Sequence, residues 1–105
     1  MSRTATPNTK DGSANTADDV TQILTERGLR YGKFINHAKI SQDLKKVIDY
    51  HLGTKFLAPD QQEALSMICH KIARIINGDP DYADSWVDIA GYAKLVADRL
   101  EGIER

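Results

Sequence analysis

Apolar residues recur at the spacing of amphipathic helices in four stretches of the chain, and no stretch alternates as a half-buried strand would. The first predicted helix begins at Thr16, a suitable N-terminal cap, and ends at Gly28. The second runs from about Asn36 to Gly53, after a connector that contains Gly32. The positions that define one face of each helix are Val20, Ile23 and Leu24, and then Ile40, Leu44, Val47, Ile48 and His51.

The third and fourth predicted helices carry longer apolar stripes. The third begins at Pro59, which suits the first turn of a helix, and runs to about Ile76. Its predicted core stripe is Leu65, Ile68, Cys69, Ile72, Ile75 and Ile76, whereas Glu63, Met67, His70 and Arg74 are expected to face the other way. The fourth runs from about Ala83 to Ile103, with Trp86, Ile89, Ala90, Ala93, Val96, Ala97 and Leu100 as its predicted buried stripe.

A tight turn, Asn77-Gly78-Asp79-Pro80, joins these last two helices, because glycine ends a helix readily and proline cannot continue it. We therefore expect an antiparallel hairpin, and the predicted fold class is all-α: a small, four-helix bundle-like single domain over residues 17–105. The first 16 residues contain only one large apolar side chain, Met1, so they are expected to form a disordered N-terminal tail.

The composition narrows the classes of partner. A formal net charge of −1, without a basic cluster, makes nucleic acid an unexpected ligand. The single cysteine, Cys69, cannot form an internal disulfide, and no apolar run is long enough for a membrane span, so a cytoplasmic location is expected. A chain of 105 residues has a small core, and Met67 and Leu95 lie off the core stripes. We therefore expect a homo-oligomer.

The candidate chemistry lies in the predicted hairpin. Asp84 and Asp88 are four residues apart and share a helix face, which Tyr92 continues. One interpretation is that Lys71 or Arg74 forms a salt bridge with one of these carboxylates, and the other is that the carboxylates hold a cation. The same helix contains Gly91, and a glycine inside a helix costs about 1 kcal/mol relative to alanine. Either close helix packing, within or between chains, or contact with a ligand would explain it.

Three segments carry a family resemblance: "RYG" at 30–32, "EALSMICHKIARIINGD" at 63–79 and "SWVDIAGYAKLVADRL" at 85–100. They resemble a family of small phage and prophage proteins of unknown function, which in turn is similar to the all-α MazG-like nucleotide pyrophosphohydrolases. The second likeness implies a dimeric or tetrameric helical bundle. It also implies Mg²⁺ ions that are held by helix-borne carboxylates and bind the phosphates of a nucleoside triphosphate.

The acidic residues match those enzymes incompletely. The enzymes have an E-x-x-E pair on one helix and an E-x-x-D pair on the next, whereas Glu63 is followed by Ser66 and Met67. The resemblance leaves Glu63, Asp84 and Asp88 as Mg²⁺ ligands, enough for one cation with water but few for two-metal catalysis. A lone histidine such as His70 is expected to be an ordinary surface or interface residue.

Two functions therefore remain open. The first is Mg²⁺-dependent nucleotide binding or hydrolysis, in which Lys71 and Arg74 contact phosphate oxygens and Tyr31 or Tyr92 stacks on the base. The second is a non-catalytic, oligomeric helical interaction module, such as a phage accessory protein or an inhibitor of a host defence protein. If the chain is phage-encoded, its expected location is the cytoplasm of the host cell.

Overall fold

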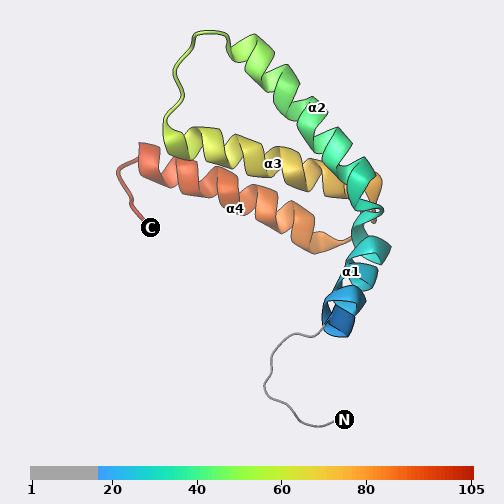
Figure 1. The fold of residues 1–105 in the computed structure, drawn as a ribbon. Helices are drawn as coiled ribbons and strands as arrows, with labels where there is room; N and C mark the ends of the chain where they lie inside the picture. The colour runs from blue at the N-terminus through green and yellow to red at the C-terminus, as the bar shows by residue number, and fades with distance from the viewer. Residues whose placement is uncertain (1–16) are drawn as a thin grey trace.

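The computed structural model describes residues 17–105, so the predicted disordered tail lies outside the described residues. The all-α prediction is confirmed for the described part of the chain. It contains four helices, α1 (Ala17–Tyr31), α2 (Phe34–Leu52), α3 (Pro59–Asn77) and α4 (Ala83–Leu100), and no strand (Figure 1). None of the four helices combines the length and the apolar character that crossing a membrane requires.

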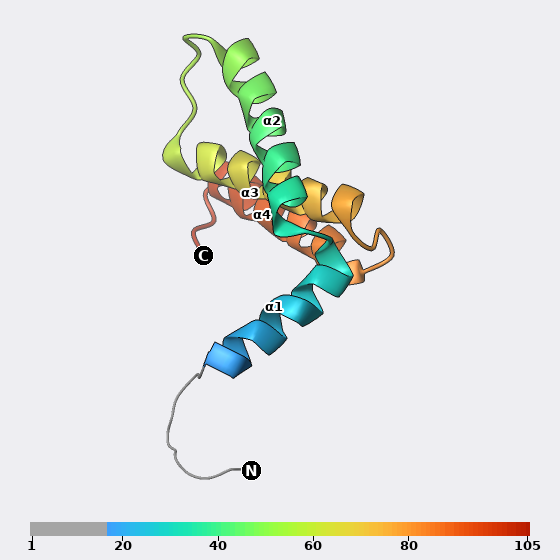
Figure 2. The ribbon, with the colours of Figure 1, turned by 45° about the vertical axis from the view of Figure 1, so that its right-hand side comes forward.

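Helix α3 is the centre of the arrangement. It contacts α1, α2 and α4, whereas α2 and α4 do not contact each other. The predicted antiparallel hairpin of α3 and α4 is confirmed, and α2 rises from α3 at a steep angle (Figure 1). Helix α1 projects away from this body and meets it only near its C-terminal end (Figure 2). The domain is therefore an open bundle in which α3 alone contacts all three other helices.

Three helix ends differ from the prediction, and one of them is the end of α4, which lies at Leu100 and not at about Ile103. Helix α1 continues through Gly28 to Tyr31, because a helical glycine costs only about 1 kcal/mol and nothing else at this position stops the helix. The chain turns instead at Gly32, whose φ of 78° is a conformation that favours glycine, and α2 begins at Phe34. The start of α3 at Pro59 is confirmed. There the side chain of Gln61 accepts a 2.8 Å hydrogen bond from the amide of Ala58.

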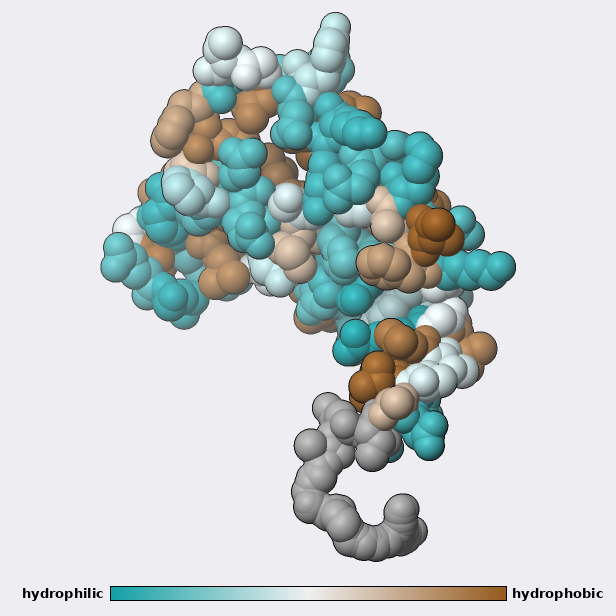
Figure 3. Space-filling view, in the orientation of Figure 1, coloured by the Kyte–Doolittle hydropathy of each residue, from teal (hydrophilic) through white to brown (hydrophobic). Residues whose placement is uncertain are grey.

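The core is small. The only buried apolar residues among those described are Ala64, Cys69 and Ala73, all on α3, and no large side chain is fully buried. On the predicted α3 stripe, Ile68, Ile72 and Ile75 are half-buried, but Leu65 and Ile76 are exposed. Hydrophobic residues accordingly reach the surface on α1 and elsewhere on the face drawn in Figure 3. A single chain thus leaves much of its apolar surface uncovered.

The predicted buried stripe of α4 was largely wrong. Only Ile89 and Val96 are half-buried; the other members of the stripe, Trp86, Ala90, Ala93, Ala97 and Leu100, are exposed. The physical reason is the position of α4 at the edge of the bundle, where α3 is its only neighbouring helix. One helix covers a narrower arc of α4 than its apolar residues occupy. We call these five exposed residues the α4 outer stripe.

Candidate functional site

An ion pair joins the two helices of the hairpin, nearer to the connecting turn than to the open end. The Nζ atom of Lys71 lies 2.9 Å from a carboxylate oxygen of Asp88. The Lys71 side chain is 11% exposed and that of Asp88 is 45% exposed, so the lysine is nearly enclosed while the carboxylate reaches solvent. The salt-bridge interpretation is therefore confirmed for this pair. The ion pair leaves part of the Asp88 carboxylate exposed to solvent.

The other predicted metal ligands lie elsewhere. Asp84 is exposed and accepts a 2.9 Å hydrogen bond from the hydroxyl of Tyr82. Glu63 is exposed on the first half of α3, which is antiparallel to α4 and so lies beside the far end of that helix from Asp84. Within residues 17–105, no three histidine, cysteine, aspartate or glutamate side chains gather as metal ligands would. One chain does not bring Glu63, Asp84 and Asp88 to a common point.

Arg74 does not pair with either aspartate. Its guanidinium lies 4.1 Å from the centre of the Tyr31 ring, on the side of α3 that faces α1. Tyr31 in turn meets the ring of Tyr82 edge-on, with 6.1 Å between the ring centres. The predicted nucleotide-binding residues therefore fall into two groups. Tyr31 and Arg74 lie together near α1, whereas Lys71 pairs with α4, the helix that carries Tyr92.

The α1–α2 connector is held tightly against the end of α3. The side-chain amide of Asn77 donates hydrogen bonds of 2.9 Å to the carbonyls of both Tyr31 and Lys33. The amide of Asp79 donates to the carbonyl of Arg30 at 2.6 Å. The sequence indicated a connector at Gly32 and a turn at residues 77–80, but it did not predict that the two contact each other. The contact fixes Tyr31 in place beside Arg74.

A hollow of about 580 Å³ opens along α4, and we call it the α4 hollow. Its lining residues include Val87, Asp88, Gly91, Tyr92, Leu95 and Asp98. A β-carbon built on Gly91 would have no atom within 4 Å. The hypothesis that this glycine permits close packing within the chain is therefore wrong. Packing between chains and contact with a ligand both remain consistent with the open space.

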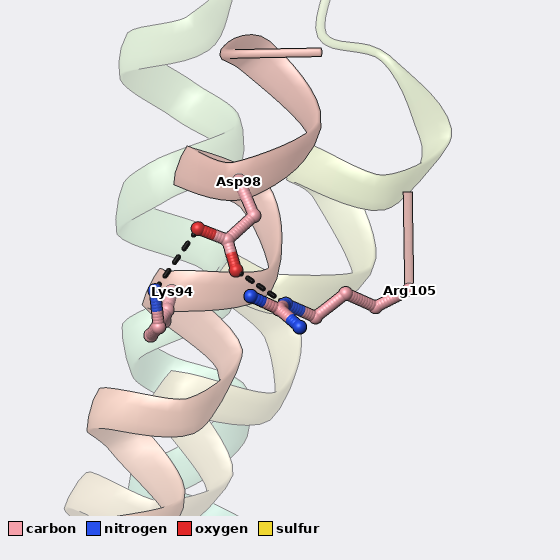
Figure 4. Close-up of polar contacts among 3 residues, drawn as sticks. All are labelled: Lys94, Asp98 and Arg105. Atoms are coloured by element: carbon pink, nitrogen blue, oxygen red, sulfur yellow. Dashed lines mark hydrogen bonds and ion pairs between the residues drawn. The ribbon is translucent and has the colours of Figure 1, made fainter. Parts of the chain in front are cut away.

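Asp98 is a buried carboxylate that sequence reasoning missed. Its side chain is 6% exposed and lies between Lys94 Nζ at 3.0 Å and Arg105 Nε at 2.6 Å (Figure 4). Hydrogen bonds from Arg105 and then Lys94 hold the pKa of this carboxyl below its ordinary value. The spacing of Lys94 and Asp98 was a readable signal of an ion pair. No signal in the sequence indicated that Arg105 also binds Asp98, because this contact depends on residues 101–105 folding back along α4.

Two histidines meet where α2 crosses α3. The ring centres of His37 and His70 are 4.4 Å apart, and His37 Nε2 lies 3.1 Å from the carbonyl oxygen of His70. Burial is the main cause that lowers the pKa of His70 to about 4, and the electrostatic effects of His37, of Arg74 and of two lysines act in the same direction. The expectation that His70 faces away from the helical body was wrong, because α2 covers this side of α3. Burial likewise lowers the pKa of His37 below its ordinary value.

A family model described as Domain of unknown function (DUF6378) matches residues 15–100 of the chain. Neither the curated proteins nor the solved structures with which the chain was compared contain a match. The matched residues include all four helices, the Lys71–Asp88 ion pair and the connector held by Asn77. The protein therefore belongs to the DUF6378 family, a domain family of unknown function.

Proposed function

We propose that the protein acts as a homo-oligomeric helical interaction module. The observation that carries this proposal is the α4 outer stripe, whose residues have the spacing of a buried helix face but are exposed in a single chain. Trp86 is 55% exposed and Leu100 is 60% exposed at its two ends. The three alanines between them would let another helix approach closely. An apolar helix face of this kind favours protein contact over solvent.

Helix α1 adds a second uncovered surface. It contains no buried residue, and Val20, Ile23 and Leu24 lie on one side of it with exposed fractions of 45%, 43% and 60%. An isolated helix of 15 residues is only marginally stable in water. Packing of its apolar side against another chain would supply the missing stabilisation.

A second copy of the chain is the partner that this argument favours. Among the described residues, no large side chain is fully buried, so the folded chain needs a partner that covers its exposed apolar surface. A second copy of the chain is always available as this partner, because it is made in the same place. The outer stripe carries no charge, so two copies can pair through it without burying an unpaired ion. Surfaces left free on the oligomer would then contact a host protein, in keeping with the resemblance to phage proteins and with a cytoplasmic location.

Light scattering during size-exclusion chromatography tests the proposal. Wild-type protein should elute at no less than twice the mass of one chain, and Ala93→Glu should shift it toward the monomer, because a charge would enter the apolar contact. Thr54→Glu, which adds the same charge in the exposed α2–α3 loop, serves as the control and should keep the oligomer. A monomeric wild type at micromolar concentration would exclude the proposal.

Nucleotide binding is the second candidate, and the α4 hollow favours it. The hollow has the size of a small-molecule site and brings the open side of Asp88 together with Tyr92. Glu63, Asp84 and Asp88 of one chain do not fit a single Mg²⁺ ion, so magnesium in this proposal requires further ligands from a second copy or from the nucleotide phosphates. Bound Mg²⁺ would supply charge neutralisation for those phosphates.

A thermal-shift screen of nucleoside triphosphates with and without Mg²⁺ separates the two candidates. A ligand at about 100 times its dissociation constant adds roughly 2.7 kcal/mol to stability. A response that needs both Mg²⁺ and Asp88 would support nucleotide binding, and release of pyrophosphate would extend it to the hydrolysis known for MazG-like enzymes. If no triphosphate stabilises the protein, the nucleotide proposal fails and the interaction module remains as the proposed function.

A further inference from the structure

A second hollow, of about 420 Å³, lies between the end of α1, the start of α2 and the second half of α3. We call it the α1/α3 hollow. Three permanent cations line it, Arg27, Lys33 and Arg74, and no aspartate or glutamate does. Its remaining lining includes the apolar or aromatic side chains of Leu24, Tyr31, Phe34 and Ile35. The hollow therefore combines an apolar wall with positive charge that no lining carboxylate balances.

One N–H group of Arg74 lacks a hydrogen-bond acceptor. The Nε atom of Arg74 is buried and has no hydrogen-bond partner among the described residues. Its guanidinium stacks on Tyr31, which satisfies the face of the group but none of its N–H donors. A buried donor left without an acceptor costs about 1 to 3 kcal/mol, so such groups almost always have a partner. A ligand oxygen in the hollow would be that partner.

The N-terminus of α2 adds further positive charge and hydrogen-bond donors to the hollow. Lys33 precedes the helix without a side-chain cap, and the first turn contains no acidic residue. The amides of Phe34 and Ile35 donate to no acceptor within residues 17–105, and both residues line the hollow. The N-terminus of a 19-residue helix is a partial positive charge with free N–H donors, the arrangement that binds phosphate in many proteins.

The histidine pair lies among the cationic side chains at the lining of the hollow. Besides burial, the groups that lower the pKa of His70 are His37, Arg74, Lys71 and Lys45, of which Lys71 is paired with Asp88. His37 and His70 both line the hollow. A bound anion would offset this repulsion, and the His70 ring would then take up a proton more readily.

We propose that the α1/α3 hollow binds a phosphate monoester, with its oxygens on Arg74 and the first amides of α2 and its apolar part against Tyr31 and Phe34. Arg27 and Lys33 attract the anion at the mouth. Guanidinium and helix N-terminus both match the several acceptor oxygens of a phosphate. The site is separate from the α4 hollow, needs no metal ion and does not depend on the oligomer proposed above.

Titration of the full chain with phenyl phosphate and with inorganic phosphate, in EDTA, tests this site, and phenol serves as the neutral control. We expect saturable binding of phenyl phosphate, weaker binding of inorganic phosphate and none of phenol. In NMR spectra, the amides of Phe34 and Ile35 should shift, and the pKa of His70 should rise from about 4. Equal binding of phenol, or saturation without these shifts, would overturn the proposal.

Variants locate the binding independently of folding. Arg74→Gln should abolish it, and Arg27→Gln, at an exposed position of α1, should weaken it about tenfold without loss of helix content. Lys46→Gln removes the same charge from an exposed position of α2 outside the hollow and should leave the affinity unchanged. Binding that Arg27→Gln and Lys46→Gln reduce equally would show a general charge effect and would also overturn the proposal.

Discussion

Gly78 lies so close to Arg30 that a β-carbon on the glycine would be 2.1 Å from the arginine carbonyl oxygen. This contact explains why the turn after α3 requires a residue without a side chain, although its φ of −125° is open to any residue. The end of α3 and the end of α1 therefore meet backbone against backbone. The same contact holds Tyr31 over Arg74.

Gly78→Ala should destabilise the fold, because the new methyl group must displace backbone rather than a flexible side chain. We expect a loss of about 1 to 3 kcal/mol in the free energy of unfolding, measured by urea denaturation. Gly28→Ala is the control, since a β-carbon there meets nothing within 4 Å and alanine favours the helix. Equal stability of the two variants would contradict the contact.

Asp88→Asn should cost more than the loss of an ordinary surface ion pair, because it leaves the nearly enclosed ammonium of Lys71 without its counter-charge. Since Asp88 itself is partly exposed, we expect about 1 to 2 kcal/mol in chemical denaturation. Adding Lys71→Met to Asp88→Asn should recover part of that loss. If the double variant is less stable than Asp88→Asn alone, the enclosed charge is not the cause.

Acidification should weaken the contact between α2 and α3. The pKa of His70 is near 4 in the folded chain and 6.5 in a model peptide, so the unfolded chain takes up protons that the folded chain resists. The free energy of unfolding should therefore fall by roughly 1 to 2 kcal/mol between pH 6.5 and pH 4, as followed by circular dichroism. His70→Gln should flatten this decline, and His51→Gln, at an exposed ring away from the contact, should retain it.

Gly91→Ala distinguishes a surface that is open in solution from one that another chain covers. In a single chain the new methyl group meets nothing, so better helix propensity should raise stability by up to about 1 kcal/mol. If a second copy packs closely here, the variant should instead lower the oligomer mass or the concentration-dependent melting temperature. Light scattering and melting curves at two concentrations separate these results.

The sequence by itself determined the helices and the hairpin. Helical spacing, Pro59 at the start of α3, and the glycine and proline of the turn at 77–80 are local signals, and each acts within a few residues of the structure that it predicts. An antiparallel hairpin also brings Lys71 and Arg74 of one helix near Asp84 and Asp88 of the next, but the sequence left open which of these residues would pair. The prediction that the first helix ends at Gly28 was wrong, because a glycine inside a helix weakens the helix without ending it.

Only the tertiary structure decided which neighbour each helix face meets. Periodicity shows that Ala93 and Ala97 share a face with Trp86, but not that this face lies outside the bundle. It likewise could not show that α2 covers His70, or that Arg74 turns toward Tyr31 and away from Asp84. These contacts depend on how helices distant in sequence cross, and crossing angles arise from packing between side chains that no local pattern brings together.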